Sequence, residues 1–509
     1  MMSVKPPSFL RTVRMSRVVL AGFRQTLMVV LINIPTLSFG MAMGWVSLAS
    51  GESVETDISD SSGSEAHMVA LASVTFCASF LGVPLSALAF ALGRKPALIG
   101  ISALFMACWG LKMCGGGWWL VAARACAGVG GAGAWTLAPL LAREMCSKGV
   151  RGAAVSALGL ANNLGILLMY IAADMHMSHR TLLWSCFLLS AVHCVVYLFV
   201  PESPQFLAAQ GHMEKAKESL AWLRGVDPGE PSLVLELSEF AIKEKEKSPF
   251  KVNSWLKLIK DMFNDPGPRR AFFLCCMLVV AQEVCGVLAL MHFAERAFVL
   301  ARDVNDDGVE RPADALGKPA RHAVYLGTAQ FVASVLALYL VEKIGRKRLM
   351  VWCGVVTGVA LVLAAAAVQW AAGDVWAAVA LIVAVFADSA GLYPAPFAMM
   401  ADMFDYKYRG CAVSLIAELE WLGNAVEVVV FPAVAAHAGI GTSLALSGVL
   451  TLLLTGFAQW KAPETRGRTT AQIYDEILGR TPKCDSVSIH DKSNDTIYES
   501  NPWKTWNKL

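Results

Sequence analysis

The chain has 509 residues, of which 56% are hydrophobic and 16% are charged, and its formal net charge is only +3. A soluble globular protein carries about 25% charged residues, so this composition excludes that class. Because the hydrocarbon core of a bilayer is about 30 Å thick, a helix that crosses it needs about 20 apolar residues. Runs of this kind predict twelve membrane helices, over residues 26–48, 67–92, 97–113, 118–142, 152–173, 182–200, 271–294, 322–341, 349–371, 375–400, 410–434 and 440–459.

The sequence lacks the patterns that catalysis and metal binding require. Its 13 cysteines are scattered, mostly within apolar runs, with no spacing typical of a disulfide framework or a metal site. No nucleophile stands with a base, and no glycine-rich phosphate loop is present. We therefore expect a chain that is not an enzyme, that needs no cofactor or metal, and that binds no nucleic acid.

Three motifs occur twice along the chain. A Gly-Arg-Lys turn stands at 93–95 and again at 345–347, and an acid precedes an Arg-Gly pair at 144–152 and at 402–410. A Pro-Glu element, at 201–204 and 463–465, follows the sixth and the twelfth apolar runs. Proline fixes φ and removes a backbone donor, so it ends each membrane helix there. This repeat predicts two six-helix halves related along the membrane normal. The expected parts are residues 1–204, a linker at 205–270, residues 271–460, and a tail at 461–509.

Charge asymmetry predicts the orientation of the chain. Residues 1–24 carry five basic side chains and no acid, whereas the loop at 51–65 carries five acids and no basic side chain. Lys and Arg collect on the cytoplasmic side of membrane proteins. We therefore expect a multi-pass protein of the plasma membrane with both termini in the cytoplasm. The linker has apolar residues at helical spacing and predicts short amphipathic helices, and the polar tail is expected to be disordered.

The paired motifs resemble those of the sugar porter family, within the major facilitator superfamily, which includes glucose and insect trehalose carriers. The chain departs from the family pattern at Phe90, where the family has Asp, and at Gln205-Phe206, where it has Arg-Trp. The resemblance implies an all-α membrane protein with twelve transmembrane helices in two halves, the major facilitator fold, and cytoplasmic amphipathic helices. It also implies a cytoplasmic charge network that latches the outward-facing state, formed by Arg94, Glu144, Arg151, Glu202, Glu342, Arg346, Asp402, Arg409 and Glu464.

The resemblance also places a substrate site between the halves, near the bilayer midplane. Gln282, Gly286, Trp421 and Asn424 match the family pattern, whereas the other positions depart from it. The expected binding residues are Gln282, Glu283, Gly286, Gln330, Ser389, Phe397, Glu420, Trp421, Asn424 and Asn162.

Several acidic residues stand in the apolar helices of the second half. Glu420, Asn424 and Glu427 have the i, i+4, i+7 spacing of one helix face, and Glu283 and Asp388 lie on other helices. One interpretation is that each carboxylate is paired within the structure. The other is a site in a central cavity that binds protons or attracts cations. His292 is expected to be a packing or hydrogen-bonding residue.

These features favour a transporter that moves a small polar solute, above all a sugar, by alternating access. The acidic residues leave open an organic cation or an amino acid as the solute. The missing acid at Phe90 and the altered sugar contacts leave open a homologue that senses a solute without transporting it. The expected partners are the solute and the lipid bilayer, with proton coupling as an option.

Overall fold

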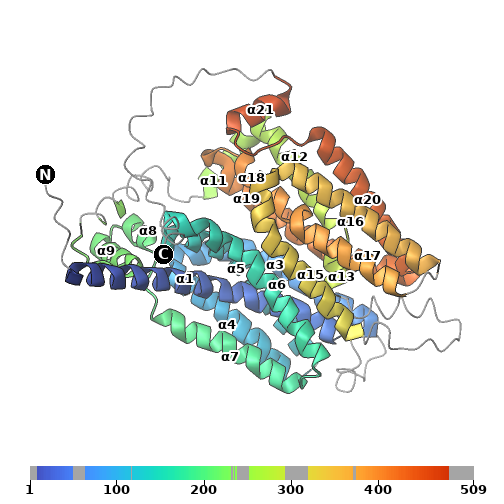
Figure 1. Ribbon diagram of the computed structural model, residues 1–509, viewed down its shortest axis with the longest axis horizontal. Coiled ribbons are helices and arrows are strands. Elements are labelled where there is room, and N and C mark those ends of the chain that lie inside the picture. Colours follow the sequence, from blue (N-terminus) through green and yellow to red (C-terminus); the bar gives the residue numbers. More distant parts are fainter. Residues whose placement is uncertain are drawn as a thin grey trace.

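The computed structural model describes residues 8–49, 64–115, 117–230, 252–292, 319–370 and 374–480, together with positions 233, 236 and 237. Nearly all of these residues lie in helices, which are arranged in two groups that follow the order of the chain (Figure 1). The first group comprises α1 (Ser8–Ala49), α3 (Ser64–Leu92), α4 (Arg94–Met113), α5 (Trp118–Met145), α6 (Lys148–Asp174) and α7 (His179–Leu198).

The second group begins after the linker. It comprises α12 (Pro266–Glu283), α13 (Val287–His292), α15 (Pro319–Ile344), α16 (Arg346–Gln369), α17 (Asp374–Ala387), a π-helical turn η1 (Asp388–Leu392), α18 (Pro394–Met403), α19 (Tyr406–Ala438) and α20 (Ile440–Lys461). The linker forms α8 (Pro204–Ala209), α9 (Met213–Arg224) and α11 (Val252–Asn264), and α21 (Thr470–Leu478) follows the last long helix. The end of the bundle near these four short helices is called the linker end below, and the other end the far end.

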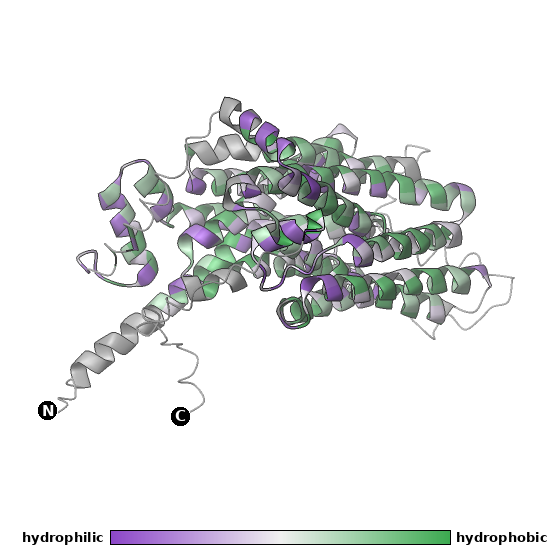
Figure 2. Cartoon of the chain, turned by 90° about the horizontal axis from the view of Figure 1, so that it is seen from above, coloured by the Kyte–Doolittle hydropathy of each residue, from purple (hydrophilic) through white to green (hydrophobic). Residues whose placement is uncertain are grey.

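The predicted fold class is confirmed. Within the described residues, eleven segments are long and apolar enough to cross a membrane, and α3 contains a shorter apolar stretch, Val69–Pro84. Together they make twelve membrane-spanning segments, because α12 with α13, and α17 with η1 and α18, each form one crossing. Hydrophobic residues run along the bundle helices, and hydrophilic residues are frequent in the short helices beyond the linker end (Figure 2).

Three predicted helices differ from the structure, and one of them, predicted at 375–400, is divided into α17, η1 and α18. The first helix begins at Ser8 rather than near residue 26 and therefore extends beyond the linker end. Arg24 Nη1 donates to the carbonyl oxygen of Trp222 at 2.6 Å, and Gln25 Nε2 donates to that of Leu223 at 3.0 Å. These bonds attach α9 to the first half. The sequence predicts a continuous seventh helix, but the helix ends at Glu283 and, after a break of three residues, continues as α13 from Val287.

The tail was expected to be disordered, and for one segment this is wrong. Thr469 and Gln472 form a capping box at the start of α21, in which each side chain satisfies a backbone N–H of the first turn. Ile473 is fully buried, and the ring of Tyr474 packs against Gly267 at the start of α12. Helix α21 therefore belongs to the second half. The predicted tail beyond 480 and the acidic loop at 51–63 lie outside the described residues.

Small residues bring the helices of the first half into close contact. A Cβ atom at Gly128 of α5 would lie 2.1 Å from the carbonyl oxygen of Thr75 in α3. No larger residue fits at that position without moving a backbone. Such close approach is how helices gain packing energy in lipid, where apolar side chains gain nothing by leaving the solvent.

Candidate functional site

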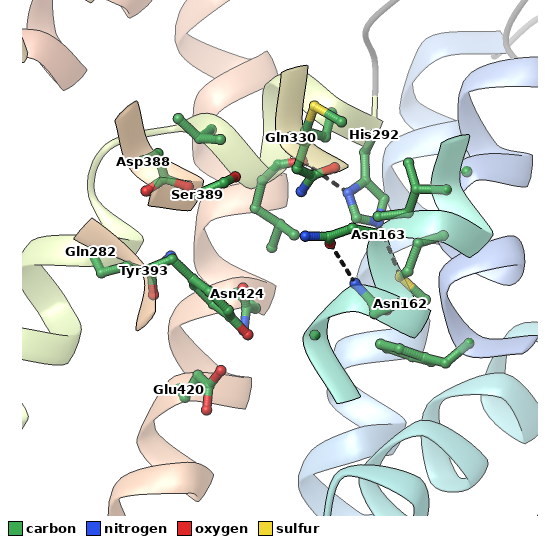
Figure 3. Close-up of a pocket in the computed structure, with 18 of the residues that line it drawn as sticks. Asn162, Asn163, Gln282, His292, Gln330, Asp388, Ser389, Tyr393, Glu420 and Asn424 are labelled. Atoms are coloured by element: carbon green, nitrogen blue, oxygen red, sulfur yellow. Dashed lines mark hydrogen bonds between the residues drawn. The ribbon is translucent and has the colours of Figure 1, made fainter. Parts of the chain in front are cut away.

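A cavity lies between the two halves. Helices α1, α3, α5 and α6 of the first half form one part of its wall, and α12, α13, α15, η1 and α19 form the rest. Its polar and ionisable side chains are shown in Figure 3, and they are Asn162, Asn163, Gln282, His292, Gln330, Asp388, Ser389, Tyr393, Glu420 and Asn424. Aromatic side chains contribute much of the remaining surface, namely Phe39, Phe76, Trp135, Tyr170 and Trp421.

The structure brings seven of the ten expected binding residues to this wall. They are Asn162, Gln282, Gln330, Ser389, Glu420, Trp421 and Asn424. The other three lie nearby but do not line the cavity. Glu283 is directed toward α19, where a Cβ at Gly423 would approach its Cγ to 2.8 Å. Gly286 lies in the break between α12 and α13, and Phe397 packs behind Tyr393, with their ring centroids 5.3 Å apart.

Sequence reasoning missed several wall residues. Asn163 and Tyr393 had no matching family position, although an aromatic residue directly before a proline that breaks a helix could have indicated Tyr393. His292 was expected to act in packing or hydrogen bonding, and it does both while also lining the cavity. Its Nδ1 lies 2.9 Å from the carbonyl oxygen of Leu288, and its ring packs against Phe76.

Three amides of the cavity wall have an oxygen without a hydrogen-bond partner. These are Oδ1 of Asn162, Oε1 of Gln282 and Oε1 of Gln330. Asn162 donates from its Nδ2 to Oδ1 of Asn163 at 3.2 Å, and Asn163 donates to Oγ of Ser334 at 2.6 Å. An unpaired buried acceptor costs about 1–3 kcal/mol. A ligand that supplies O–H donors would remove this cost.

Contacts between the two halves continue from the cavity toward the far end. The hydroxyl of Tyr170 in α6 donates to the carbonyl oxygen of Met291 in α13. Nε2 of His292 lies 3.2 Å from Sδ of Met43 in α1. Nearer the far end, Arg321 of α15 forms an ion pair with Asp174 of α6 at 3.6 Å. Helix α13 is therefore bound directly to the first half.

Aromatic rings also join the halves next to the cavity. Trp421 of α19 lies with its ring centroid 5.9 Å from that of Phe39 and 6.3 Å from that of Phe76. The contact with Phe39 is edge to face, an arrangement that places the positive ring edge against a negative ring face. Trp421 thus presents a flat apolar surface at the boundary between the halves.

The charged motifs of the first half meet one another at the linker end. Arg94 donates from Nη2 and Nε to the Glu144 carboxylate at 3.0 and 3.1 Å, and Ser203 Oγ donates to the same carboxylate at 2.6 Å. Glu202 accepts the backbone N–H of Lys95 at 3.0 Å. The turn after α3, the end of α5 and the Pro-Glu-Ser-Pro element are therefore held together.

The second half repeats this arrangement. Arg346 forms an ion pair with Asp402, and its backbone N–H donates to Glu464 at 3.1 Å. Arg409 donates instead to the carbonyl oxygen of Phe404, at 3.0 and 3.2 Å. The side chains of two further network residues, Arg151 and Glu342, lie outside the described residues.

The charge network was expected to join the halves to each other. The ion pairs Arg94–Glu144 and Arg346–Asp402 each join helices of one half: α4 with α5, and α16 with α18. The arrangement accounts for the duplicated motifs, since each half needs the same brace. A latch across the halves remains a prediction for another conformation of the chain.

Comparison with protein families decides what this architecture is. The model of the family "Sugar (and other) transporter" matches residues 35–476. The chain belongs to this family. The protein is therefore a membrane transporter.

The chain is also similar to individual relatives, and a solved structure shares its fold. The transporter is 27% identical over 378 residues to "Probable metabolite transport protein CsbC" of Bacillus subtilis, with 72% of this chain and 76% of the relative covered. It is 28% identical over 354 residues to the facilitated glucose transporter member 2 of Rattus norvegicus, with 67% and 63% covered. The inward open structure of the xylose transporter XylE from E. coli superposes with a TM-score of 0.70 at 20% identity, over 89% of this chain and 98% of that chain.

Proposed function

We propose that this transporter carries a neutral sugar across a membrane by alternating access. The observation that carries the proposal is the set of three unpaired amide oxygens in the cavity wall, on Asn162, Gln282 and Gln330. A sugar offers several hydroxyl donors, and its apolar ring face matches an indole such as that of Trp421. Glucose is named for the rat relative, and a proton:xylose symporter for a solved structure of the same fold.

The proposal assigns roles to the parts of the chain. Residues 1–204 and 271–460 would rock against each other about the cavity, with 205–270 as their connection. The linker end would face the cytoplasm, because Lys and Arg collect at cytoplasmic ends. The membrane would be the plasma membrane. The wall residues, including Ser389, Glu420 and Asn424, would contact the solute. Glu283, Gly286 and Phe397 lie behind the wall, so they would affect the solute site without contacting the solute.

Solute counterflow tests this proposal. The full-length protein is reconstituted into vesicles loaded with unlabelled D-glucose, and entry of labelled D-glucose is measured without any ion gradient. We expect transient accumulation of label that depends on the protein. Gln282→Leu and Gln330→Leu should each raise the half-saturating concentration about fivefold, since each removes an acceptor worth about 1 kcal/mol.

Gln369→Leu is the matched control, because Gln369 is exposed at the end of α16 and far along the chain from either site residue. It should leave counterflow unchanged. Labelled trehalose, choline and amino acids are tested in parallel. Counterflow of choline or an amino acid with none of either sugar would refute the proposed substrate class.

A further inference from the structure

Four carboxylates lie around the point where the seventh crossing is broken. Glu283 ends α12, and the acidic groups that interact with it electrostatically are Glu427, Glu420 and Asp388. None of the four takes part in an ion pair of the described residues. The transport cavity explains two of them, because Asp388 and Glu420 line it (Figure 3). Glu283 and Glu427 lie behind the wall and need another explanation.

These two side chains are almost completely buried. Glu283 is 5% exposed, and neither of its carboxylate oxygens has a hydrogen-bond partner. Glu427 is 8% exposed; its Oε1 accepts the backbone N–H of Ala289 at 2.9 Å, and its Oε2 has no partner. An ionised carboxylate buried without a countercharge costs several kcal/mol, and two of them in proximity repel each other. The pair is therefore built to hold at least one proton.

The geometry favours a proton over a metal ion. Within the described part of the chain, no three acidic, histidine or cysteine side chains converge closely enough to hold a metal. A metal such as Ca²⁺ takes six to eight oxygen ligands, whereas a proton needs a single carboxylate oxygen. Among the described residues, the other titratable groups that interact with the pair have no positive charge; they are Cys285, Asp388, Tyr393 and Glu420.

The pair is also connected to the helix that closes the cavity. Ala289, which donates to Glu427, belongs to α13. The same short helix contains Met291 and His292, which line the cavity and contact the first half. Helix α13 is thus held on one side by a carboxylate of the second half and on the other by the first half. A change of charge at Glu427 acts directly on this connection.

We propose that Glu283 and Glu427 form a proton-binding site that couples proton movement to solute movement. The inference rests on the proposed sugar transport and adds a second cargo to it. With one proton bound, the pair carries a single negative charge, and Glu427 accepts the backbone N–H of Ala289 in α13. When the proton leaves, both carboxylates are charged and repel each other, and the packing of α12, α13 and α19 around the pair changes. One proton is taken up at one face of the membrane and released at the other for each sugar that crosses.

Proton-driven accumulation tests the coupling. Vesicles with the full-length protein and an internal pH dye receive labelled D-glucose with the outside one pH unit more acidic than the lumen. One proton per sugar supports accumulation of up to about tenfold under this gradient. We expect wild type to concentrate the label and to acidify the lumen when D-glucose is added.

Glu283→Gln and Glu427→Gln keep the side-chain shape but cannot exchange a proton, and each should reduce the accumulation ratio to about 1 while counterflow persists. Glu214→Gln, an exposed change of the same kind in α9, should leave the ratio as in wild type. Wild type that shows counterflow without acidification or accumulation would overturn the coupling and leave sugar transport standing.

Accumulation retained by both glutamine variants would overturn the assigned site. Absence of D-glucose counterflow in wild type contradicts the proposed function and, with it, the inference. Should Glu283→Gln not yield folded protein in size-exclusion chromatography, Glu427→Gln and the proton flux of wild type decide the question.

Discussion

Asn163 and Ser334 come from different halves of the chain, and Nδ2 of Asn163 donates a hydrogen bond of 2.6 Å to Oγ of Ser334. Their helices, α6 and α15, remain in contact toward the far end, where a Cβ at Gly327 would lie 2.8 Å from the ring of Tyr170. The same tyrosine donates to Met291 in α13. This seam closes the cavity toward the far end, and alternating access requires it to separate.

The Tyr170 hydroxyl is a suitable place to weaken this seam. Tyr170→Phe removes the hydrogen bond to Met291 and keeps the ring against Gly327. A buried hydrogen bond contributes about 1 kcal/mol, which corresponds to about a fivefold change in a conformational equilibrium. We expect the amides of α13 to exchange their hydrogens about fivefold faster, as measured by mass spectrometry.

A matched control is available within the first half. Tyr197 is equally buried, and its hydroxyl contacts Sδ of Met145 at 3.9 Å without reaching the second half. Tyr197→Phe should leave exchange in α13 unchanged. Equal exchange of α13 in wild type and Tyr170→Phe would show that this bond does not hold the seam.

The break between α12 and α13 depends on one glycine. Gly286 has φ of 75°, a conformation that costs a residue with a Cβ about 1–2 kcal/mol. A Cβ there would also lie 2.9 Å from Phe431 Cδ2 and from Ser447 Oγ. Gly286→Ala should therefore lower the unfolding temperature and slow counterflow. Gly456→Ala, in an open position of α20, should change neither. Equal behaviour of the two variants would contradict the special role of Gly286.

The positions of the helices could be predicted because a membrane helix is defined by the length of its apolar run. The break in the seventh crossing could not, since a glycine in an apolar run is compatible with a continuous helix. The break at Gly286 depends on packing against Phe431 and Ser447, which stand about 145 and 161 positions later in the chain.

The sequence predicts which helices form the site better than it predicts which of their side chains line the cavity. Gln282 and Glu283 are neighbours on one helix and point about 100° apart, so motif matching alone cannot decide which of them faces the cavity. The structure places Gln282 in the wall and Glu283 against Gly423. Glu427 shares a face with Glu420 and Asn424 in the sequence pattern, but it bonds to Ala289 because α13 passes close to it.

Orientation in the membrane can be tested with epitope tags. The basic residues of 1–24 and the acidic loop at 51–65 predict that the linker end faces the cytoplasm. Tags at the C-terminus and within 238–251 should be protected in intact cells, and a tag beside Asp57 should be labelled from outside. Labelling of the C-terminal tag in intact cells would reverse the assignment. Permeabilised cells, in which all tags are labelled, provide the control.

The duplicated charged braces should contribute unequally to stability. Glu144 is 3% exposed and binds both Arg94 and Ser203, whereas Asp402 is 29% exposed. Glu144→Gln removes the carboxylate charge that Arg94 and Ser203 bind at a largely buried position, which costs about 3 kcal/mol. Asp402→Asn removes a more solvated pair, worth about 1 kcal/mol or less, and Thr465 still lies 3.4 Å from Arg346 Nη1.

Thermal unfolding in detergent measures this difference. Both variants lose one negative charge at the linker end, so each serves as the control for the other. We expect Glu144→Gln to lower the unfolding temperature clearly more than Asp402→Asn does, because little water reaches the buried site to compensate for the lost carboxylate charge. Equal losses would mean that the two braces are energetically equivalent. A larger loss for Asp402→Asn would contradict the ranking by burial and point to a charge contact of Asp402 across the halves.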